Sequence, residues 1–377
     1  MTSEVFLTRT GAFLPFAPVG NDEIEDVLGL VGGKPSRARR VVLRSNGIRS
    51  RHYALDRVTG EPLLSNAQLA ANAIRAMGNI GPVDCLAAGT SLPDQLLPSH
   101  AVMVHGELAW PRLQVVSCAG ICLAGTAALK YAWLALRAGD ARRAVATGSD
   151  RPSPLLLGRH FDAEIEHQVQ ALEDRPSLAF EKDFLRWMLS DGAGAALLET
   201  SPRGPLSLRI DWIELSSAAH ELPTCMYAGG EKGADDTLRG WMQFPHHEWH
   251  TKSVFAIKQD VRLLNDNVVR ATLREPLAEL VSKRKLRADA IDWFLPHLSS
   301  QYFEQPVCAA LAEVGLPIPR DRWFSNLASK GNTGAAAPYI ALDELFRSGR
   351  IKPGQTVLMF VPESGRFSSG FVYMEAV

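Results

Sequence analysis

The stretch from Leu113 to Gly139 constrains the fold more than any other part of this chain of 377 residues. It begins with an apolar β-type run at 113–116 and passes through small residues around Cys118 and Cys122. It ends in an Ala-rich helical pattern that Gly139 terminates. Because small residues allow close packing on several sides, the pattern predicts a helix buried between two sheets.

A similar order of elements recurs late in the chain. A small-residue turn opens a helical pattern that Gly349 ends, and a strand-like run follows at 356–361. The two terminating glycines, Gly139 and Gly349, are 210 residues apart (349 − 139). We therefore predict an α/β protein of two similar halves, residues 1–200 and 201–377, each with one central Ala-rich helix.

Composition narrows the class of protein. The chain is 46% hydrophobic and 21% charged, with a formal net charge of -1, which is ordinary for a globular protein and gives no global indication of nucleic-acid binding. Its five cysteines are an odd number, and no signal pattern opens the sequence, so we expect free thiols in a reducing cytoplasm. No uncharged apolar run reaches the length of about 18 residues that a membrane span needs.

Cys118 is the first candidate for chemistry. We expect it at a strand-to-helix junction, where the helix dipole and free backbone N–H groups favour the thiolate. A thiolate at such a corner can accept an acyl group, and the small neighbours Ala119 and Gly120 would let a substrate approach. The alternative is a buried structural cysteine, because free cysteines are among the most buried residues.

Two further residues can join this cysteine. His297 follows a buried-type strand at 291–296, and Asn332 opens the helical pattern of the second half. A Cys-His-Asn hydrolase has the same chain order. However, the Cys-Gly-Ser/Ala-Cys signature is absent, and His297 follows Cys118 by 179 residues (297 − 118), beyond the roughly 130–150 of papain-like enzymes.

The segment 34–57 is basic, with eight cationic residues against the one acid Asp56. Within it, Arg44 and Arg49 are candidates for contacting a phosphate or an acidic carrier protein, and a solvated loop is the alternative. The polar segment 216–252 includes His246 and His250, which are spaced i, i+4 beside Glu248. This spacing is not the His-Glu-x-x-His of zinc enzymes and no third ligand stands out, so we favour a flexible loop or a lid over a substrate channel.

Taken together, these features resemble the β-ketoacyl carrier-protein synthase III branch of the thiolase superfamily. The resemblance covers most of the chain and rests on motifs that are specific only in combination. They are Gly11–Pro15, Arg44–His52, Leu97–Ser99, Cys118–Gly120, Gly148–Asp150, Asp191–Ala195, Trp293–His297, Gly331–Ala336 and Gly365–Gly370.

The resemblance implies a five-layer αβαβα thiolase fold, a homodimer and Claisen chemistry. Cys118 would carry the acyl group, and His297 and Asn332 would hydrogen-bond the thioester oxygen of a malonyl- or β-ketoacyl-type extender. The backbone N–H groups of Cys118 and Gly365 would form the oxyanion hole. It implies no bound cofactor, since acyl groups arrive on the phosphopantetheine of acyl carrier protein or on coenzyme A.

The chain also departs from the family pattern. Ser300 stands where the family usually has Asn, Ser364-Gly365-Arg366 replaces a Gly-Gly-Gly turn, and the Trp that stacks on coenzyme A has no clear match. These departures favour a carrier-protein donor and a specialised pathway. The runs Arg44–Arg51 and Phe184–Met188 resemble ketosynthases that build dialkylresorcinols from two acyl chains. The rival interpretations are acyl transfer to oxygen or nitrogen without condensation and a non-catalytic partner subunit.

Overall fold

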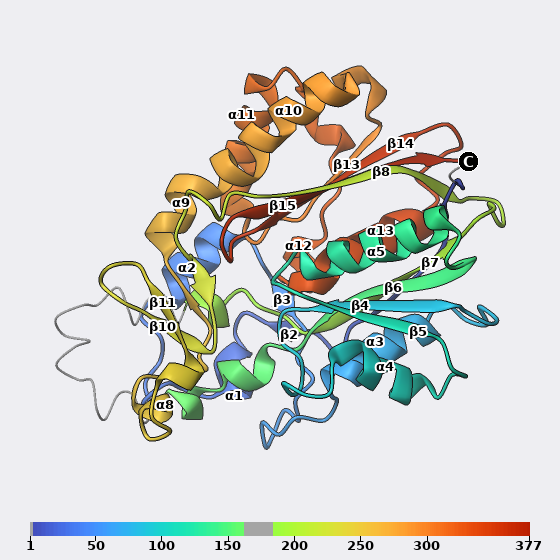
Figure 1. The fold of residues 1–377 in the computed structure, drawn as a ribbon. Helices are drawn as coiled ribbons and strands as arrows, with labels where there is room; N and C mark the ends of the chain where they lie inside the picture. Colours follow the sequence, from blue (N-terminus) through green and yellow to red (C-terminus); the bar gives the residue numbers. More distant parts are fainter. Residues whose placement is uncertain (1–2, 162–183) are drawn as a thin grey trace.

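The computed structural model describes residues 3–161 and 184–377, and it places them in five layers (Figure 1). Two helices form the central layer, α5 (Ala124–Ala138) and α13 (Ala337–Arg347), with sheet strands above and below them. Helices α3 (Asn66–Arg75) and α4 (His100–Leu108) cover one outer face. Helices α9 (Val261–Val269), α10 (Glu275–Arg284) and α11 (Glu304–Glu313) cover the other. The predicted αβαβα class is confirmed.

The strands form one mixed sheet in the order β13-β14-β15-β8-β1-β7-β6-β4-β5. The strands that lie below the central helices are β1 (Phe6–Phe13), β4 (Cys85–Thr90), β5 (Gln114–Ala119), β6 (Arg143–Asp150) and β7 (Gly192–Glu199). Those above are β8 (Leu208–Ser217), β13 (Trp293–Pro296), β14 (Thr356–Glu363) and β15 (Ser368–Ala376). Just two residue pairs, Phe6 with Arg209 and Leu7 with Leu208, join β1 to β8, so the sheet can fold around the central helices.

The central helices approach each other and the sheet closely because their contact positions are small. A side chain at Gly148 would bring a Cβ to 2.2 Å from the Ala335 carbonyl oxygen, and one at Gly125 would come to 2.4 Å from the same atom. The Tyr339 hydroxyl then donates to the Gly125 carbonyl at 2.8 Å. The predicted placement of both Ala-rich helices between sheet layers is confirmed.

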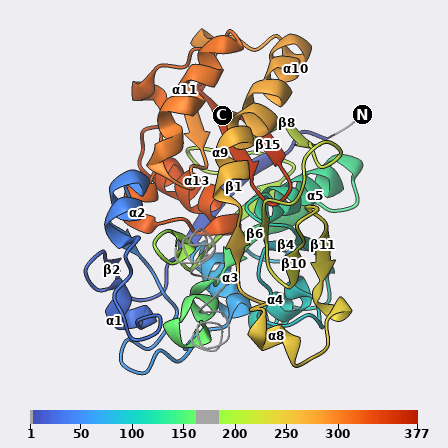
Figure 2. The same ribbon diagram turned by 90° about the vertical axis from the view of Figure 1, so that its left-hand side faces the viewer.

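Short elements gather at one end of the layers, on the left of Figure 1 and facing the viewer in Figure 2. On one side are α1 (Ile24–Leu28), α2 (Arg39–Asn46), β2 (Val19–Gly20) and β3 (Ser50–Arg51). On the other are β9 (Met226–Tyr227), β10 (Gly230–Lys232), β11 (Leu238–Gly240), α8 (Glu248–Thr251) and β12 (Lys258–Gln259). The remaining α12 (Leu327–Lys330) precedes the turn that carries Asn332.

In the described part of the chain, no helix combines the length and apolar character needed to cross a bilayer.

Candidate active site

A cavity of about 680 Å³ lies where the corner before α5, the end of β6 and the β14–β15 turn meet. Its walls also include residues from the loop after β4, the loop after β13 and the segment that carries β9 to β12. Cys122, Asn332 and Gly365 are among the residues that line it. The volume and the partly apolar lining are those of a small-molecule site.

Cys118 lies at the end of a strand, before the turn that leads into α5. It is inside strand β5, paired with Gly89 of β4, and six positions before the first residue of α5, Ala124. It is not among the residues that line the cavity. Burial raises the pKa of its thiol. The predicted strand-to-helix junction is present, and Cys118 lies on its strand side, one residue before β5 ends at Ala119. Its predicted role as nucleophile stays a prediction.

Cys122 lies on the helix side of this junction. It lies in the turn between β5 and α5, two residues before Ala124, and its side chain is buried at one end of the cavity. Burial, together with the carboxylates of Glu363 and Asp150, raises the pKa of this thiol. The sulfur is thus a protonated thiol at neutral pH beside a helix N-terminus.

Asn332 lies in the turn after α12 and lines the same cavity. Its backbone N–H donates to the Met188 carbonyl at 3.0 Å, and its side-chain oxygen accepts from the Gly334 N–H at 3.1 Å. These contacts fix both the backbone and the amide plane. The cavity therefore brings together one predicted site residue, Asn332, and the cysteine that sequence reasoning did not choose.

His297 follows β13 and is held by its backbone N–H, which donates to the Phe360 carbonyl at 2.8 Å. Its ring is buried, and Nε2 has no hydrogen-bond partner among the described residues. Burial lowers its pKa to about 4, so the ring is neutral at pH 7. His297 lines two small cavities of about 20 and 30 Å³, while its neighbour Ser299 lines the large one.

Gly365 lies in the turn between β14 and β15 and faces the corner that carries Cys122. A Cβ at this position would come to 2.9 Å from the Ile121 side chain, so glycine permits the close approach of the two turns. The Gly365 carbonyl accepts from the Cys225 N–H at 2.9 Å, which anchors the turn. The predicted role of Gly365 in an oxyanion hole stays a prediction.

Glu363, the last residue of β14, is a cavity residue that sequence reasoning missed. One oxygen of its carboxylate accepts from the N–H groups of Ile121 at 2.8 Å and Leu123 at 3.1 Å. The carboxylate therefore accepts hydrogen bonds from the backbone N–H groups on both sides of Cys122. No local sequence motif predicts these contacts, because they join residues 242 and 240 positions apart.

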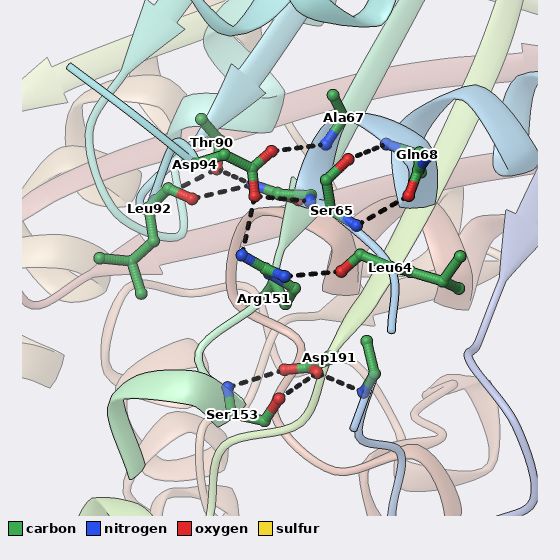
Figure 3. A network of polar contacts seen from close by, with 12 residues as sticks. Leu64, Ser65, Ala67, Gln68, Thr90, Leu92, Asp94, Arg151, Ser153 and Asp191 are labelled. Carbon is green, nitrogen blue, oxygen red and sulfur yellow. Dashed lines mark hydrogen bonds and ion pairs between the residues drawn. The ribbon is translucent and has the colours of Figure 1, made fainter. Parts of the chain in front are cut away.

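The loop after β4, which forms another part of the wall, is fixed by a polar network (Figure 3). The Asp94 carboxylate accepts from the Asn66 and Ala67 N–H groups at 2.8 and 3.0 Å and pairs with Arg151 at 2.9 Å. Arg151 also donates to the Leu64 carbonyl at 2.6 Å. These hydrogen bonds and the ion pair hold the loop after β4 in one position, so this side of the cavity is preorganised.

The Asp150 carboxylate, at the end of β6, hydrogen-bonds both to the loop after β4 and to the turn before α13. It accepts from the Thr90 hydroxyl at 3.0 Å, the Ser91 N–H at 2.8 Å and the Ala335 N–H at 2.6 Å. Burial nevertheless raises the pKa of Asp150. These contacts place the end of β6 against the turn that carries Asn332 and so close the inner end of the cavity.

The segment 216–252 contributes an apolar wall. Leu238 and Trp241, with Phe255 just beyond, line the cavity. His246 packs against Trp249 with ring centroids 4.4 Å apart and ring planes tilted by 48°, and Trp249 Nε1–H donates to the Trp241 carbonyl at 3.1 Å. No group of three potential metal ligands occurs among the described residues. The segment thus supplies a wall of the cavity, and the predicted lid stays a prediction.

The basic segment 34–57 divides into two groups. Arg39 pairs with Asp22 at 2.8 Å, and the buried Arg51 donates to the Asn21 side chain at 2.5 Å, so these two hold the fold together. Arg44 and Arg49 are exposed and lie outside the cavity lining. Arg44 lies on α2, which is at the end of the molecule that faces the viewer in Figure 2. Both arginines stay candidates for a docking role.

Residues 281–373 match the family model described as 3-oxoacyl-[acyl-carrier-protein (ACP)] synthase III C terminal. The C-terminal part of this chain is therefore similar to the C-terminal part of the synthase III family. The matched residues include His297, Asn332, Glu363 and Gly365, so the second half of the site lies within the matched region.

Solved structures show the same fold along the whole chain. A tetronic acid condensing enzyme, AbyA1, is 22% identical, with a TM-score of 0.74, covering 98% of this chain and 99% of the other. The 3-oxoacyl-(acyl carrier protein) synthase III FabH from Pseudomonas aeruginosa PAO1 is 20% identical, with a TM-score of 0.71 and coverage of 99% and 98%. An OleA variant from Xanthomonas campestris is 18% identical, with a TM-score of 0.73 and coverage of 99% and 98%.

Proposed function

We propose that this synthase III-like chain forms a carbon–carbon bond between a cysteine-bound acyl group and a second thioester, in specialised lipid or polyketide biosynthesis of the dialkylresorcinol kind. The observation that carries the proposal is the meeting of Cys122, Asn332 and Gly365 in one cavity of about 680 Å³. A cavity of this size accommodates a long acyl chain against the apolar wall of Leu238, Trp241 and Phe255.

The nucleophile in this proposal is Cys122 rather than Cys118. Cys122 lies on the cavity and beside the N-terminus of α5, whereas Cys118 is part of the β4–β5 ladder. Cys122 attacks the donor thioester, and its sulfur becomes acylated as the carrier thiol leaves. The backbone N–H groups of Cys122 and Gly365 are then the donors for the oxyanion, in place of the Cys118 N–H of the sequence-based prediction.

His297 and Asn332 serve the second half-reaction. The neutral His297 ring carries a buried Nε2 with no partner in the described structure, and a buried polar atom of this kind needs a hydrogen-bonding group. The thioester oxygen of the incoming extender is such a group, and hydrogen bonds from His297 and Asn332 would stabilise its enolate. Asn332 supports condensation over acyl transfer to oxygen or nitrogen, since those reactions need no enolate.

Acyl groups arrive on the phosphopantetheine arm of an acyl carrier protein. The exposed Arg44 and Arg49, with the nearby exposed cations of α2, suit an acidic protein surface. Two copies of this chain would associate through β5, which ends the sheet and leaves Gln114, Ser117 and Ala119 exposed. The cytoplasm is the compartment that its free thiols suit.

The test is the product formed from a panel of carrier-bound acyl, malonyl and β-ketoacyl thioesters. Carbon–carbon-bonded products, with a Cys122-linked acyl intermediate seen by mass spectrometry, support the proposal. Acyl esters or amides without a new carbon–carbon bond would replace it with simple acyl transfer. Release of free acid alone would favour the hydrolase alternative.

A further inference from the structure

Glu363 is an unexpected residue beside a reactive cysteine. Its carboxylate accepts hydrogen bonds from the N–H groups of Ile121 and Leu123, at 2.8 and 3.1 Å, and so sits at the N-terminus of α5 on both flanks of Cys122. It is half-buried and lines the cavity. A fixed negative charge here disfavours the thiolate and any other anion that enters the same end of the cavity.

The other charges of the cavity reinforce this effect. Asp94 and Asp150 also line it, and of the described lining residues only Arg366 is cationic. The Nε–H of Arg366 donates to the Leu222 carbonyl at 2.9 Å in an exposed setting. The carboxylate of a malonyl extender would be repelled by the three carboxylates of this lining. The one cation, Arg366, already donates to a backbone carbonyl. The charge of the lining therefore disfavours a malonyl extender.

An extender without a carboxylate loses no CO2, and its α-carbon must instead lose a proton. A β-ketoacyl thioester has an acidic α-C–H between two carbonyls. Of the three lining carboxylates, Asp94 is paired with Arg151, and Asp150 accepts three hydrogen bonds. Glu363 has backbone contacts to one carboxylate oxygen only, and these come from Ile121 and Leu123, the two residues that flank Cys122.

We propose that Glu363 is the general base of the condensation and that it makes this enzyme specific for an uncarboxylated, β-ketoacyl-type extender. This inference rests on the proposed function. The α-C–H bond breaks, and its proton passes to the Glu363 carboxylate. The carbanion attacks the acyl carbon on Cys122, the carbon–carbon bond forms, and the carbon–sulfur bond breaks. The departing thiolate takes the proton from Glu363, so the cycle closes without CO2 release or an oxidant.

The two half-reactions give the test. Wild-type protein is first acylated at Cys122 with an acyl carrier-protein thioester and is then given a β-ketoacyl or a malonyl thioester. We expect wild type to condense the β-ketoacyl extender at least about 100-fold faster than the malonyl extender, without CO2, and with a primary isotope effect for the α-deuterated extender.

Glu363→Gln keeps an oxygen that can accept both N–H groups, but it cannot take a proton. We expect condensation with the β-ketoacyl extender to fall by about 10²–10⁴-fold. Acylation of Cys122 should become faster, because the neighbouring negative charge that raises the thiol pKa is gone. Glu363→Asp should restore part of the condensation. Glu279→Gln, at an exposed site on α10, is the matched control and should change neither rate.

The possible failures are distinct. If Glu363→Gln condenses the β-ketoacyl extender as fast as wild type, or if wild type prefers malonyl with stoichiometric CO2, the inference is overturned. An equal fall in acylation and condensation would make Glu363 the base for the thiol and would also overturn it. A wild-type protein that is never acylated at Cys122 overturns the proposed function itself.

Discussion

The buried His297 predicts a specific sensitivity of this protein to acid. Its folded-state pKa is lowered to about 4 from 6.5 because the ring is desolvated. Since the folded-state pKa is depressed, the stability that the neutral ring contributes is present above pH 6.5 and is lost as the pH falls from 6.5 towards 4. Linkage gives a loss of about 2 kcal/mol between pH 8 and pH 5 from this one residue.

The substitution His297→Gln isolates this effect, because glutamine does not titrate and still carries a hydrogen-bond donor. Urea unfolding of both proteins at pH 8, 7, 6 and 5 yields the free energy of unfolding at each pH. Other titrating groups change both proteins alike, so the measured quantity is the change in their difference. We expect wild type to lose about 2 kcal/mol more than His297→Gln by pH 5. A difference that stays constant with pH would refute the buried, neutral assignment of His297.

Three further predictions concern packing, docking and chain length. In chemical denaturation, Gly148→Ala should lower the free energy of unfolding by about 2–3 kcal/mol, because its Cβ would lie 2.2 Å from a backbone oxygen. Gly106→Ala is the matched control in the same assay. It should raise the free energy of unfolding by roughly 0.5–1 kcal/mol, because its Cβ would have no atom within 4 Å. Reversing both exposed charges with Arg44→Glu and Arg49→Glu should raise KM for an acyl carrier-protein substrate about tenfold and leave KM for a short synthetic thioester unchanged. Trp241→Ala should weaken long-chain more than short-chain acyl donors in KM measurements, since Trp241 lines the apolar wall.

The architecture could be predicted from the sequence because it depends on local patterns that repeat along the chain. The Ala-rich helices and their terminating glycines predicted α5 and α13, and His297 directly follows a strand as predicted. Asn332 lies in the turn between α12 and α13 and not at the first residue of a helix. The choice between Cys118 and Cys122 was not accessible in the same way. The two are four residues apart, and the apolar run at 113–116 gave no sign that β5 continues through Ala119.

Long-range contacts account for the rest. Glu363 acquires its importance from the N–H groups of Ile121 and Leu123, which it meets only when β14 lies beside the corner before α5. The basic segment shows the same limit, because composition could not separate the exposed Arg44 from the buried Arg51. Patterns along the chain therefore predict the elements, whereas the chemistry of the site depends on which turns the sheet brings together.

Acylation mapping tests the central claim most directly. Wild type, Cys122→Ala and Cys118→Ala are incubated with an acyl carrier-protein thioester, quenched and examined by intact mass. Peptide fragmentation then locates the acyl group, because no Lys or Arg separates the two cysteines. We predict one acyl group on Cys122 in wild type, the same adduct in Cys118→Ala and none in Cys122→Ala. An adduct on Cys118, or undiminished acylation of Cys122→Ala, would contradict the account.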